Sequence, residues 1–213
     1  DLADHYGFSE DLVGMYQQSD ISSSSVTSSS KVSIKRPKFL TKWVPRPKHI
    51  NRQVVEAAID RSLQRMHVES LDMIQFHWWD YSNKNYLRAL EILDDLRREG
   101  KIRHLGLTNF DTEHLQEILD HGIPVISNQI QFSILDQRPL EKMVPFCEKH
   151  QIGLLAYGTL GGGLYTSQFF SQTPPQIFDF DTSSLQKYYG MVSRWGKWQV
   201  FLQFLQEIHA IAE

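Results

Sequence analysis

Polar side chains stand near the same end of five successive apolar runs in this 213-residue chain. These side chains are Lys42 in PKFLTKWV, His77 in LDMIQFHW, Thr108 and Asn109 in IRHLGLTN, Asn128 and Gln129 in PVISNQ, and Tyr157 in GLLAYG. A polar group inside a buried strand costs free energy unless it finds a partner. The repetition of this placement therefore indicates a functional site where the strands end.

Each residue also has a structural explanation when it is taken alone. Lys42 could extend its ammonium to the rim of the fold, and His77 could be a core histidine with satisfied hydrogen bonds. Asn109 could cap a helix, and Gln129 could bond a loop carbonyl. Tyr157 could pack in the core with its hydroxyl at the edge. The site hypothesis depends on the joint pattern, because no single member requires it.

Several other kinds of site lack the residues that they need. His77 has no second His or Cys at metal-ligand spacing, so we expect no bound metal. No G-x-S-x-G motif supports a nucleophilic serine. No G-x-G-x-x-G follows a strand, and the glycine-rich GTLGGGL from Gly158 to Leu164 lacks the Lys-Ser/Thr pair of a P-loop. The absent dinucleotide motif disfavours an open dinucleotide-binding sheet.

Helical patterns separate the apolar runs. NRQVVEAAIDRSLQRMH has apolar residues at helical spacing, and NYLRALEILDDLRREG places four leucines on one face before Gly100. DTEHLQEILDHG, PLEKMVPFCEKHQ and the stretch from about Trp195 to Glu213 also predict helices. Short apolar strands between helices are typical of a parallel sheet that helices cover, so the fold class is α/β. The pattern alone leaves a closed (β/α)₈ barrel and an open doubly wound sheet as alternatives.

The composition is ordinary for a soluble globular protein, with 41% hydrophobic residues, 22% charged residues and a formal net charge of −3. We expect no nucleic-acid partner, because a solvated loop explains the cluster of Lys35, Arg36 and Lys38. No apolar run of about 18 residues predicts a membrane span. The single cysteine, Cys147, suits a reducing compartment, so we expect a cytoplasmic location, with an organelle as the alternative. The oligomeric state is open.

One segment has a different composition. SDISSSSVTSSSKVS, from Ser19 to Ser33, is rich in serine and has almost no apolar side chains. Such a segment cannot offset its ordering entropy by burial, so we expect a flexible insertion at about residues 19–34. The rest of residues 1–213 is expected to form a single domain.

The sequence resembles the aldo-keto reductase family in several blocks that follow the family's order. DLADHYG is similar to the family's D-x-A-x-x-Y-G segment, SEDLVG to its following helix, and FLTKW to the strand that bears its lysine. DRSLQRMHVESLDMIQFHWWD and LRREGKIRHLGLTNF resemble its R-S-L…H-W and R-x-G-K-I-R-x-x-G-x-S-N-F segments. SNQIQFSILD and LLAYGTLGGGL also match. The resemblance implies a (β/α)₈ barrel that reduces aldehyde or ketone carbonyls to alcohols with a nicotinamide cofactor, usually NADPH, with NADH not excluded.

The resemblance implies a catalytic tetrad of Asp1, Tyr6, Lys42 and His77. Tyr6 matches the general acid that protonates the carbonyl oxygen, and Asp1 and Lys42 match the ion pair beside it. His77 matches the histidine that orients the carbonyl. A nearby ammonium strengthens a phenol as an acid, an aspartate holds and balances that lysine, and a neutral histidine donates a hydrogen bond to a developing alkoxide.

By the same resemblance, Asn109 and Gln129 match residues that bind the carboxamide of the nicotinamide ring. Thr108 stands where the family often has serine. Tyr157 matches the aromatic residue that stacks on the nicotinamide. The backbone from Gly158 to Leu164, which includes Leu160, matches a loop along the pyrophosphate, where small residues permit close approach.

The small-molecule carbonyl substrate is expected to meet an apolar wall. Trp78 and Trp79 are the candidates for this wall, although packing at the rim is as good an explanation for one of the two. Substrate identity depends on loops that follow the strands, and those loops carry no transferable code. The sequence therefore predicts the class of substrate and not its identity.

Parts of the family pattern have no match here. The chain begins at the residue that would end the second barrel strand and ends after a helix that would precede the eighth. We therefore expect an incomplete barrel, with strands 1 and 8 absent and strand 2 mostly absent, and with Asp1 poorly fixed. No residues match the basic groups that recognise the adenosine 2′-phosphate. A non-catalytic, reductase-like binding or regulatory protein, or an inactive fragment, is the alternative to the enzyme.

Overall fold

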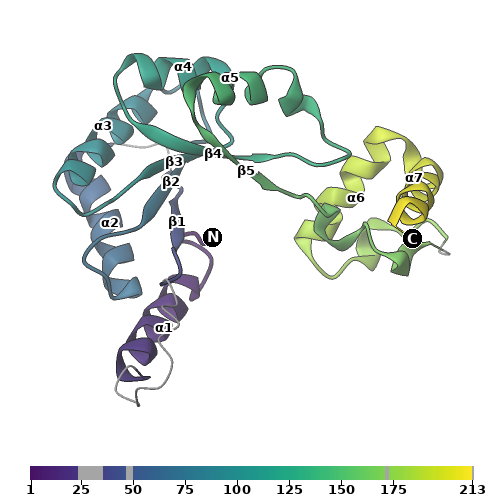
Figure 1. Ribbon diagram of the computed structural model, residues 1–213, viewed down its shortest axis with the longest axis horizontal. Coiled ribbons are helices and arrows are strands. Elements are labelled where there is room, and N and C mark those ends of the chain that lie inside the picture. Colours follow the sequence, from purple (N-terminus) through teal and green to yellow (C-terminus); the bar gives the residue numbers. More distant parts are fainter. Residues whose placement is uncertain (24–35, 47–49, 171–172, 213) are drawn as a thin grey trace. The chain divides into compact units, whose positions relative to one another are not determined.

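The computed structural model describes residues 1–23, 36–46, 50–170 and 173–212. Helices and strands alternate along most of the chain (Figure 1). The elements are α1 Ser9–Ser23, β1 Leu40–Trp43, α2 Arg52–Met66, β2 Met73–His77, α3 Asn85–Arg98, β3 Leu105–Thr108, α4 Thr112–Asp120, β4 Val125–Gln131, η1 Arg138–Leu140, α5 Met143–His150, β5 Gly153–Tyr157, η2 Gly161–Gly163, η3 Ser167–Phe169, η4 Ile177–Asp179, α6 Ser183–Trp195 and α7 Lys197–Ala212.

The five strands form one sheet in the chain order β1-β2-β3-β4-β5. The pairs from β1 to β4 are parallel, which confirms the α/β class. Lys42 pairs in register with Gln75, and His77 pairs with Thr108. Thr108 pairs in turn with Gln129. Paired residues of a pleated sheet point to the same face and residues two apart share a face, so these five side chains lie on one face of the sheet.

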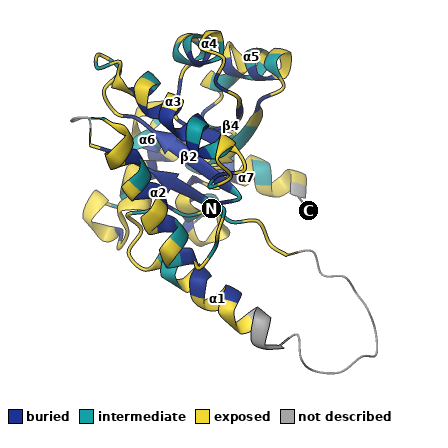
Figure 2. Cartoon of the chain, turned by 90° about the vertical axis from the view of Figure 1, so that its left-hand side faces the viewer, coloured by how far each residue is buried: buried dark blue, intermediate teal, exposed yellow. Residues whose placement is uncertain are grey.

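The opposite face carries the apolar core against the helices. Phe76 of β2 lies against Trp43, Trp78 and Phe110, with ring centroids 5.6–6.1 Å apart. Every residue of β2 is buried, as Figure 2 shows in dark blue. Asn51 caps α2 by accepting a hydrogen bond from the Val54 amide at 3.0 Å. A strand buried on both faces explains why LDMIQFHW has no alternation of polar and apolar residues.

The first residues run parallel to β1, although they form no assigned strand. The Leu2 amide donates to the Leu40 carbonyl at 2.7 Å, and the Asp4 amide donates to the Lys42 carbonyl at 2.9 Å. Helix α1 then packs against α2 at Gly14, where an added Cβ would lie 2.2 Å from the Arg65 carbonyl oxygen. The lack of a side chain at this position permits the two helices to approach this closely.

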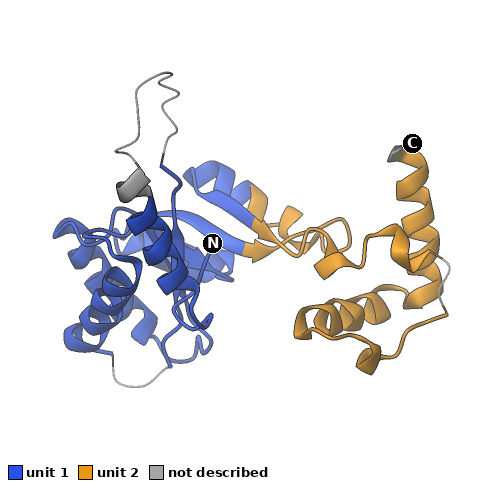
Figure 3. Cartoon of the chain, turned by 90° about the horizontal axis from the view of Figure 1, so that it is seen from below, with its two compact units in different colours: residues 1–129, 145–155 blue, residues 130–144, 156–213 orange. Residues whose placement is uncertain are grey.

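The described chain divides into two compact units (Figure 3). The first holds residues 1–129 and 145–155, and the second holds residues 130–144 and 156–213. The second unit has its own apolar cluster, whose buried members are Leu164, Phe169, Phe180, Tyr188, Val192, Trp198, Phe201 and Leu205. The single domain with a flexible insertion stays a prediction.

Two expectations about the elements need correction. Residues 19–23, expected to be flexible, are the last residues of α1, while residues 24–34 of the serine-rich segment lie outside the described residues. The helix expected over PLEKMVPFCEKHQ is divided into η1 and α5. Pro145 is the third residue of α5, where the missing N–H costs no internal hydrogen bond, so the helix has to begin just before it.

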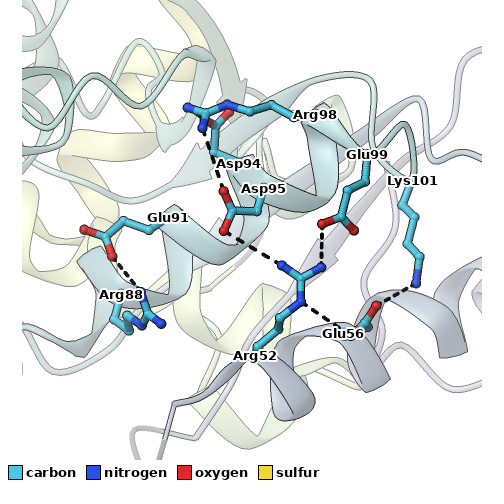
Figure 4. A network of polar contacts seen from close by, with 9 residues as sticks. All are labelled: Arg52, Glu56, Arg88, Glu91, Asp94, Asp95, Arg98, Glu99 and Lys101. Carbon is cyan, nitrogen blue, oxygen red and sulfur yellow. Dashed lines mark hydrogen bonds and ion pairs between the residues drawn. The ribbon is translucent and has the colours of Figure 1, made fainter.

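Charged side chains connect α2 and α3 at the surface of the first unit (Figure 4). Arg52 of α2 lies 2.5 Å from Glu99, 3.8 Å from Asp95 and 3.8 Å from Glu56. Lys101 lies 3.1 Å from Glu56 and so extends the network to the segment before β3. Arg52 and its partners are well exposed, so solvent screens each pair, and the network mainly connects α2 with the end of α3.

Candidate active site

Two members of the expected tetrad lie on neighbouring strands and on the same face of the sheet. Lys42 is the third residue of β1, and His77 is the last residue of β2. Both side chains are buried. Register places Gln75 opposite Lys42 and two residues before His77 on that face. The sheet thus brings a cation, an amide and an imidazole together where the strands end.

Asp1 is held in place, so the expectation that it would be poorly fixed was wrong. Its Oδ1 atom lies 3.5 Å from Nζ of Lys42 and accepts a hydrogen bond from Nε2 of Gln75 at 2.5 Å. The backbone bonds of Leu2 and Asp4 to β1 carry the residue to this position. The sequence predicts that Asp1 is loose because no strand precedes it. Hydrogen bonds between residues 2–4 and β1 hold it instead.

Lys42 is a buried cation beside the phenol of Tyr6. Burial lowers the pKa of the Lys42 ammonium, and the nearby Asp4 carboxylate partly opposes that shift. Nζ lies 5.8 Å from the centroid of the Tyr6 ring. The Tyr6 side chain is 54% exposed, so a solute can reach its hydroxyl. The buried ammonium thus lies over the ring of an accessible tyrosine.

His77 is neutral at physiological pH. Burial is the largest cause that lowers its pKa to about 4, and the positive charges of Lys42 and His5 add to the effect. A neutral imidazole retains one N–H donor for a ligand oxygen. The Trp79 ring lies against it, with centroids 4.4 Å apart. Trp79 is 69% exposed and therefore forms an accessible apolar surface beside His77.

Trp78 has a different role from Trp79. It is fully buried against Phe76, with stacked rings 5.8 Å apart. Its Nε1 donates to the carbonyls of Asp80 at 2.7 Å and Asn83 at 3.1 Å. Trp78 is thus the packing member of the tryptophan pair, and it anchors the loop after β2. The expectation that it forms part of a substrate wall does not fit this position.

Asn109 follows β3 in the left-handed region, with a φ of 60°. Asparagine adopts this conformation more readily than most residues. The backbone amide of Asn109 donates to the backbone carbonyl of Gln129 at 2.8 Å, and this hydrogen bond joins the end of β3 to β4. Asp111, and not Asn109, caps α4 by accepting from the His114 amide at 2.9 Å. The capping explanation of Asn109 is therefore wrong.

Two supports of this loop were not expected from the sequence. Asn128 is completely buried. Its Nδ2 donates to the backbone carbonyl of Phe110 at 2.8 Å, and its Oδ1 accepts from the backbone amide of Phe110 at 3.4 Å. The Tyr81 hydroxyl donates to the Asn109 carbonyl at 3.2 Å. Adjacent residues of a strand point to opposite faces, but only the register shows that Gln129, and not Asn128, shares the face of Lys42 and His77.

Two buried polar side-chain atoms in strands β2 and β3 have no hydrogen-bond partner within the described part of the chain. They are Oγ1 of Thr108 and Oε1 of Gln75. Both residues belong to the face of the sheet that carries Lys42 and His77. A buried polar atom without a partner costs about 1–3 kcal/mol, so such atoms mark a place where a ligand or ordered water supplies the missing bond. The Thr108 hydroxyl can donate to or accept from a polar group such as a carboxamide.

Three further candidates belong to the second unit. Tyr157 faces the ammonium of Lys187, which lies 4.9 Å from its ring centroid. Gly158 has a φ of 73°, and an added Cβ would lie 2.3 Å from the Tyr188 hydroxyl. Leu160 is largely exposed. The positive φ and the close tyrosine both require glycine at position 158.

Two features are absent from residues 1–23, 36–46, 50–170 and 173–212. No group of three or more His, Cys, Asp or Glu side chains is placed to hold a metal ion. None of the helices is both long enough and apolar enough to cross a membrane.

The model of the aldo/keto reductase family matches residues 1–213. The chain belongs to the aldo/keto reductase family. A solved aldo/keto reductase of Klebsiella pneumoniae, in complex with NADP and acetate, is 24% identical, with a TM-score of 0.63 over 84% of this chain and 58% of that one. The likeness confirms the (β/α)₈ barrel fold, of which the described residues contribute the five strands of an incomplete barrel.

Curated aldo/keto reductase relatives match a shorter stretch. The NADH-specific methylglyoxal reductase of Escherichia coli (strain K12) is 30% identical over 56% of this chain and 37% of its own length. The methylglyoxal reductase DkgA of Yersinia pestis is 31% identical over 57% of this chain and 47% of its own length. The matched region therefore spans less than half the length of either relative.

Proposed function

We propose that this aldo/keto reductase chain belongs to an enzyme that reduces aldehyde or ketone groups of small molecules to alcohols with NADPH. The observation that carries the proposal is the arrangement around Lys42: its buried ammonium lies 3.5 Å from Oδ1 of Asp1 and 5.8 Å from the ring centroid of Tyr6. His77 lies on the same face of the sheet as Lys42. Family membership favours catalysis over the non-catalytic alternative.

The chain's own residues divide the proton chemistry among them. Tyr6 gives its hydroxyl proton to the carbonyl oxygen of the substrate, and Lys42 stabilises the phenolate that forms. Asp1 balances the buried ammonium. His77, neutral because of its burial, donates an N–H to the same oxygen and so orients the carbonyl. The exposed ring of Trp79 supplies an apolar surface for the substrate.

Family membership assigns the residues that would hold the nicotinamide cofactor. Thr108, whose buried Oγ1 has no partner among the described residues, would bind the carboxamide with Asn109 and Gln129. Tyr157, with the backbone of Gly158 to Leu160, would meet the ring and the pyrophosphate. The cofactor supplies the hydride when it is bound, and the protein supplies position and electrostatics.

The choice between NADPH and NADH is part of the proposal. The Klebsiella pneumoniae neighbour was solved with NADP, whereas the Escherichia coli relative is named NADH-specific. Both cofactors are therefore tested, and methylglyoxal serves as the first aldehyde because two relatives carry it in their names. We also propose a cytoplasmic location, which the single buried Cys147 favours because it suits a reducing compartment.

Replacing the Tyr6 hydroxyl tests the function. Tyr6→Phe should lower kcat for NADPH oxidation with methylglyoxal by about 10²–10⁴-fold, because the general acid is lost. Cofactor binding, followed by fluorescence titration, should not change. Tyr16→Phe on α1 is the matched control and should keep full activity. Full activity in Tyr6→Phe would refute the assignment, and cofactor binding by the wild type without turnover of any aldehyde would favour the non-catalytic alternative.

A further inference from the structure

Gln75 is a polar residue in the middle of a strand whose five residues are all buried. The residue is 0% exposed, and it lies between Lys42 of β1 and Gly106 of β3 in the register of the sheet. It shares its face with His77, two residues further along β2. A buried amide at this position needs a compensating interaction, because burying it without one costs free energy.

The Gln75 side chain contacts Asp1, a member of the proposed catalytic tetrad. Nε2 of Gln75 donates to Oδ1 of Asp1 at 2.5 Å, and the same Oδ1 atom lies 3.5 Å from Nζ of Lys42. The other end of the amide, Oε1, has no partner within the described part of the chain. Only the amide nitrogen can donate, so the carboxylate sets the orientation of the Gln75 side chain and the side chain in turn fixes the carboxylate.

The neighbouring strand leaves room for this side chain. Gly106 pairs with Gln75, and a Cβ added at Gly106 would lie 3.5 Å from Cγ of Gln75 and 3.1 Å from Sδ of Met73. It would also lie 2.6 Å from Oγ of Ser127, closer than atoms can pack. The glycine therefore lets the side chains of β2 and β4 fill the face between them, which keeps Gln75 in place.

We propose that Gln75 is a positioning residue that holds the Asp1 carboxylate against the Lys42 ammonium. An amide suits this task because it donates a hydrogen bond without a charge that would compete with Lys42. The Asp1 side chain is 46% exposed, so without Gln75 it can turn toward water. The buried ammonium then keeps the nearby Asp4 carboxylate but loses the Asp1 carboxylate, with which it forms an ion pair at 3.5 Å. The catalytic consequence rests on the proposed function, whereas the structural consequence for Lys42 does not.

The experiment compares Gln75→Met with Ser127→Ala in the full chain. Methionine keeps the length and volume of glutamine but cannot donate, and Ser127 is a buried polar residue of the same face that contacts Met73 and not Asp1. In Gln75→Met, the titration of Lys42, followed through its side-chain carbon signal by NMR, should move to lower pH by about one unit. The pH profile of kcat should move with it, and KM for NADPH should stay within twofold. Ser127→Ala should change neither profile.

A double mutant separates positioning from general loss of structure. Once Asp1→Asn has removed the charged partner, adding Gln75→Met should shift the Lys42 titration no further, because the two residues act through one contact. Equal Lys42 titrations in wild type and Gln75→Met, or an undiminished shift in the Asp1→Asn background, would overturn the proposal. If the wild type reduces no aldehyde, the proposed function fails, and the Lys42 titration still decides the role of Gln75.

Discussion

The hydroxyl of Tyr81 donates a hydrogen bond to the backbone carbonyl of Asn109 at 3.2 Å. The Tyr81 ring is in turn held by His114, with centroids 4.2 Å apart, and by the edge of Phe110 at 5.2 Å. Asn109 is the left-handed residue that directly follows β3. The loop after β2 thus supports the conformation of a residue that we assign to cofactor binding.

Removing the Tyr81 hydroxyl should weaken cofactor binding. Tyr81→Phe keeps the ring contacts but loses one hydrogen bond, so we expect Kd for NADPH to rise about 2–10-fold. Tyr86→Phe is the matched control, because Tyr86 belongs to the same aromatic cluster while its hydroxyl bonds Glu117. Isothermal titration of both variants gives the comparison. An equal rise in the two variants would show that the cluster acts through general stability rather than through Asn109.

The neutral His77 should make the fold sensitive to acid. Its pKa is about 4 in the folded protein against 6.5 in the unfolded chain, so the unfolded state binds more protons between these values. The contribution of His77 to stability is complete above pH 6.5 and is lost as the pH falls toward 4. The total loss corresponds to about 3 kcal/mol.

Urea unfolding of wild type and His77→Gln between pH 4 and 7 measures this contribution. The free energy of unfolding should fall less steeply with acid in His77→Gln, since glutamine takes up no proton. Carboxylates whose pKa is lowered by partners, such as Asp136 beside Arg138, affect both proteins equally. Identical slopes for the two proteins would contradict the neutral burial of His77.

Gly158 and Gly122 offer a matched pair for testing the glycine-rich segment. Both have a φ of 73°, but an added Cβ meets the Tyr188 hydroxyl at Gly158 and nothing within 4 Å at Gly122. Gly122→Ala should therefore cost only the left-handed strain of about 1–2 kcal/mol. Gly158→Ala should cost a further 1–3 kcal/mol or so, because Tyr188 has to move. Unfolding by urea, followed by circular dichroism, compares them, and equal costs would mean that Tyr188 does not pack on Gly158.

The strands and their polar ends could be predicted from the sequence. A parallel strand that helices cover is buried on both faces, so MIQFH and LGLT appear as short apolar runs. The polar residues that interrupt such runs stand out because they are costly there. Helices α2, α3 and α4 were equally plain, because their apolar residues recur at helical spacing.

The supports of the site depend on contacts between distant residues. Gln75 is a polar residue in the same apolar run as His77 but not at its end, and only the structure places it beside Lys42 and Asp1. Asn128 and Gln129 are adjacent and similar, yet they face opposite sides of β4. The sequence does not predict helix α6, SSLQKYYGMVSRW. It begins with two serines and has Gly190 in its interior, and these residues lower its helix propensity.

The order of the strands has a consequence for how the chain folds. Each strand pairs with the strand of the preceding β/α unit, so no strand has to insert between two that have already paired. The sheet can therefore grow by one unit at a time as the chain leaves the ribosome. Each pairing closes only the loop of one β/α unit, so the loss of chain entropy before the strands pair stays small. The contact between Asp1 and Gln75 is the opposite case, because it joins residues 74 positions apart. The first residue thus takes its final position only after β2 has been synthesised and added to the sheet.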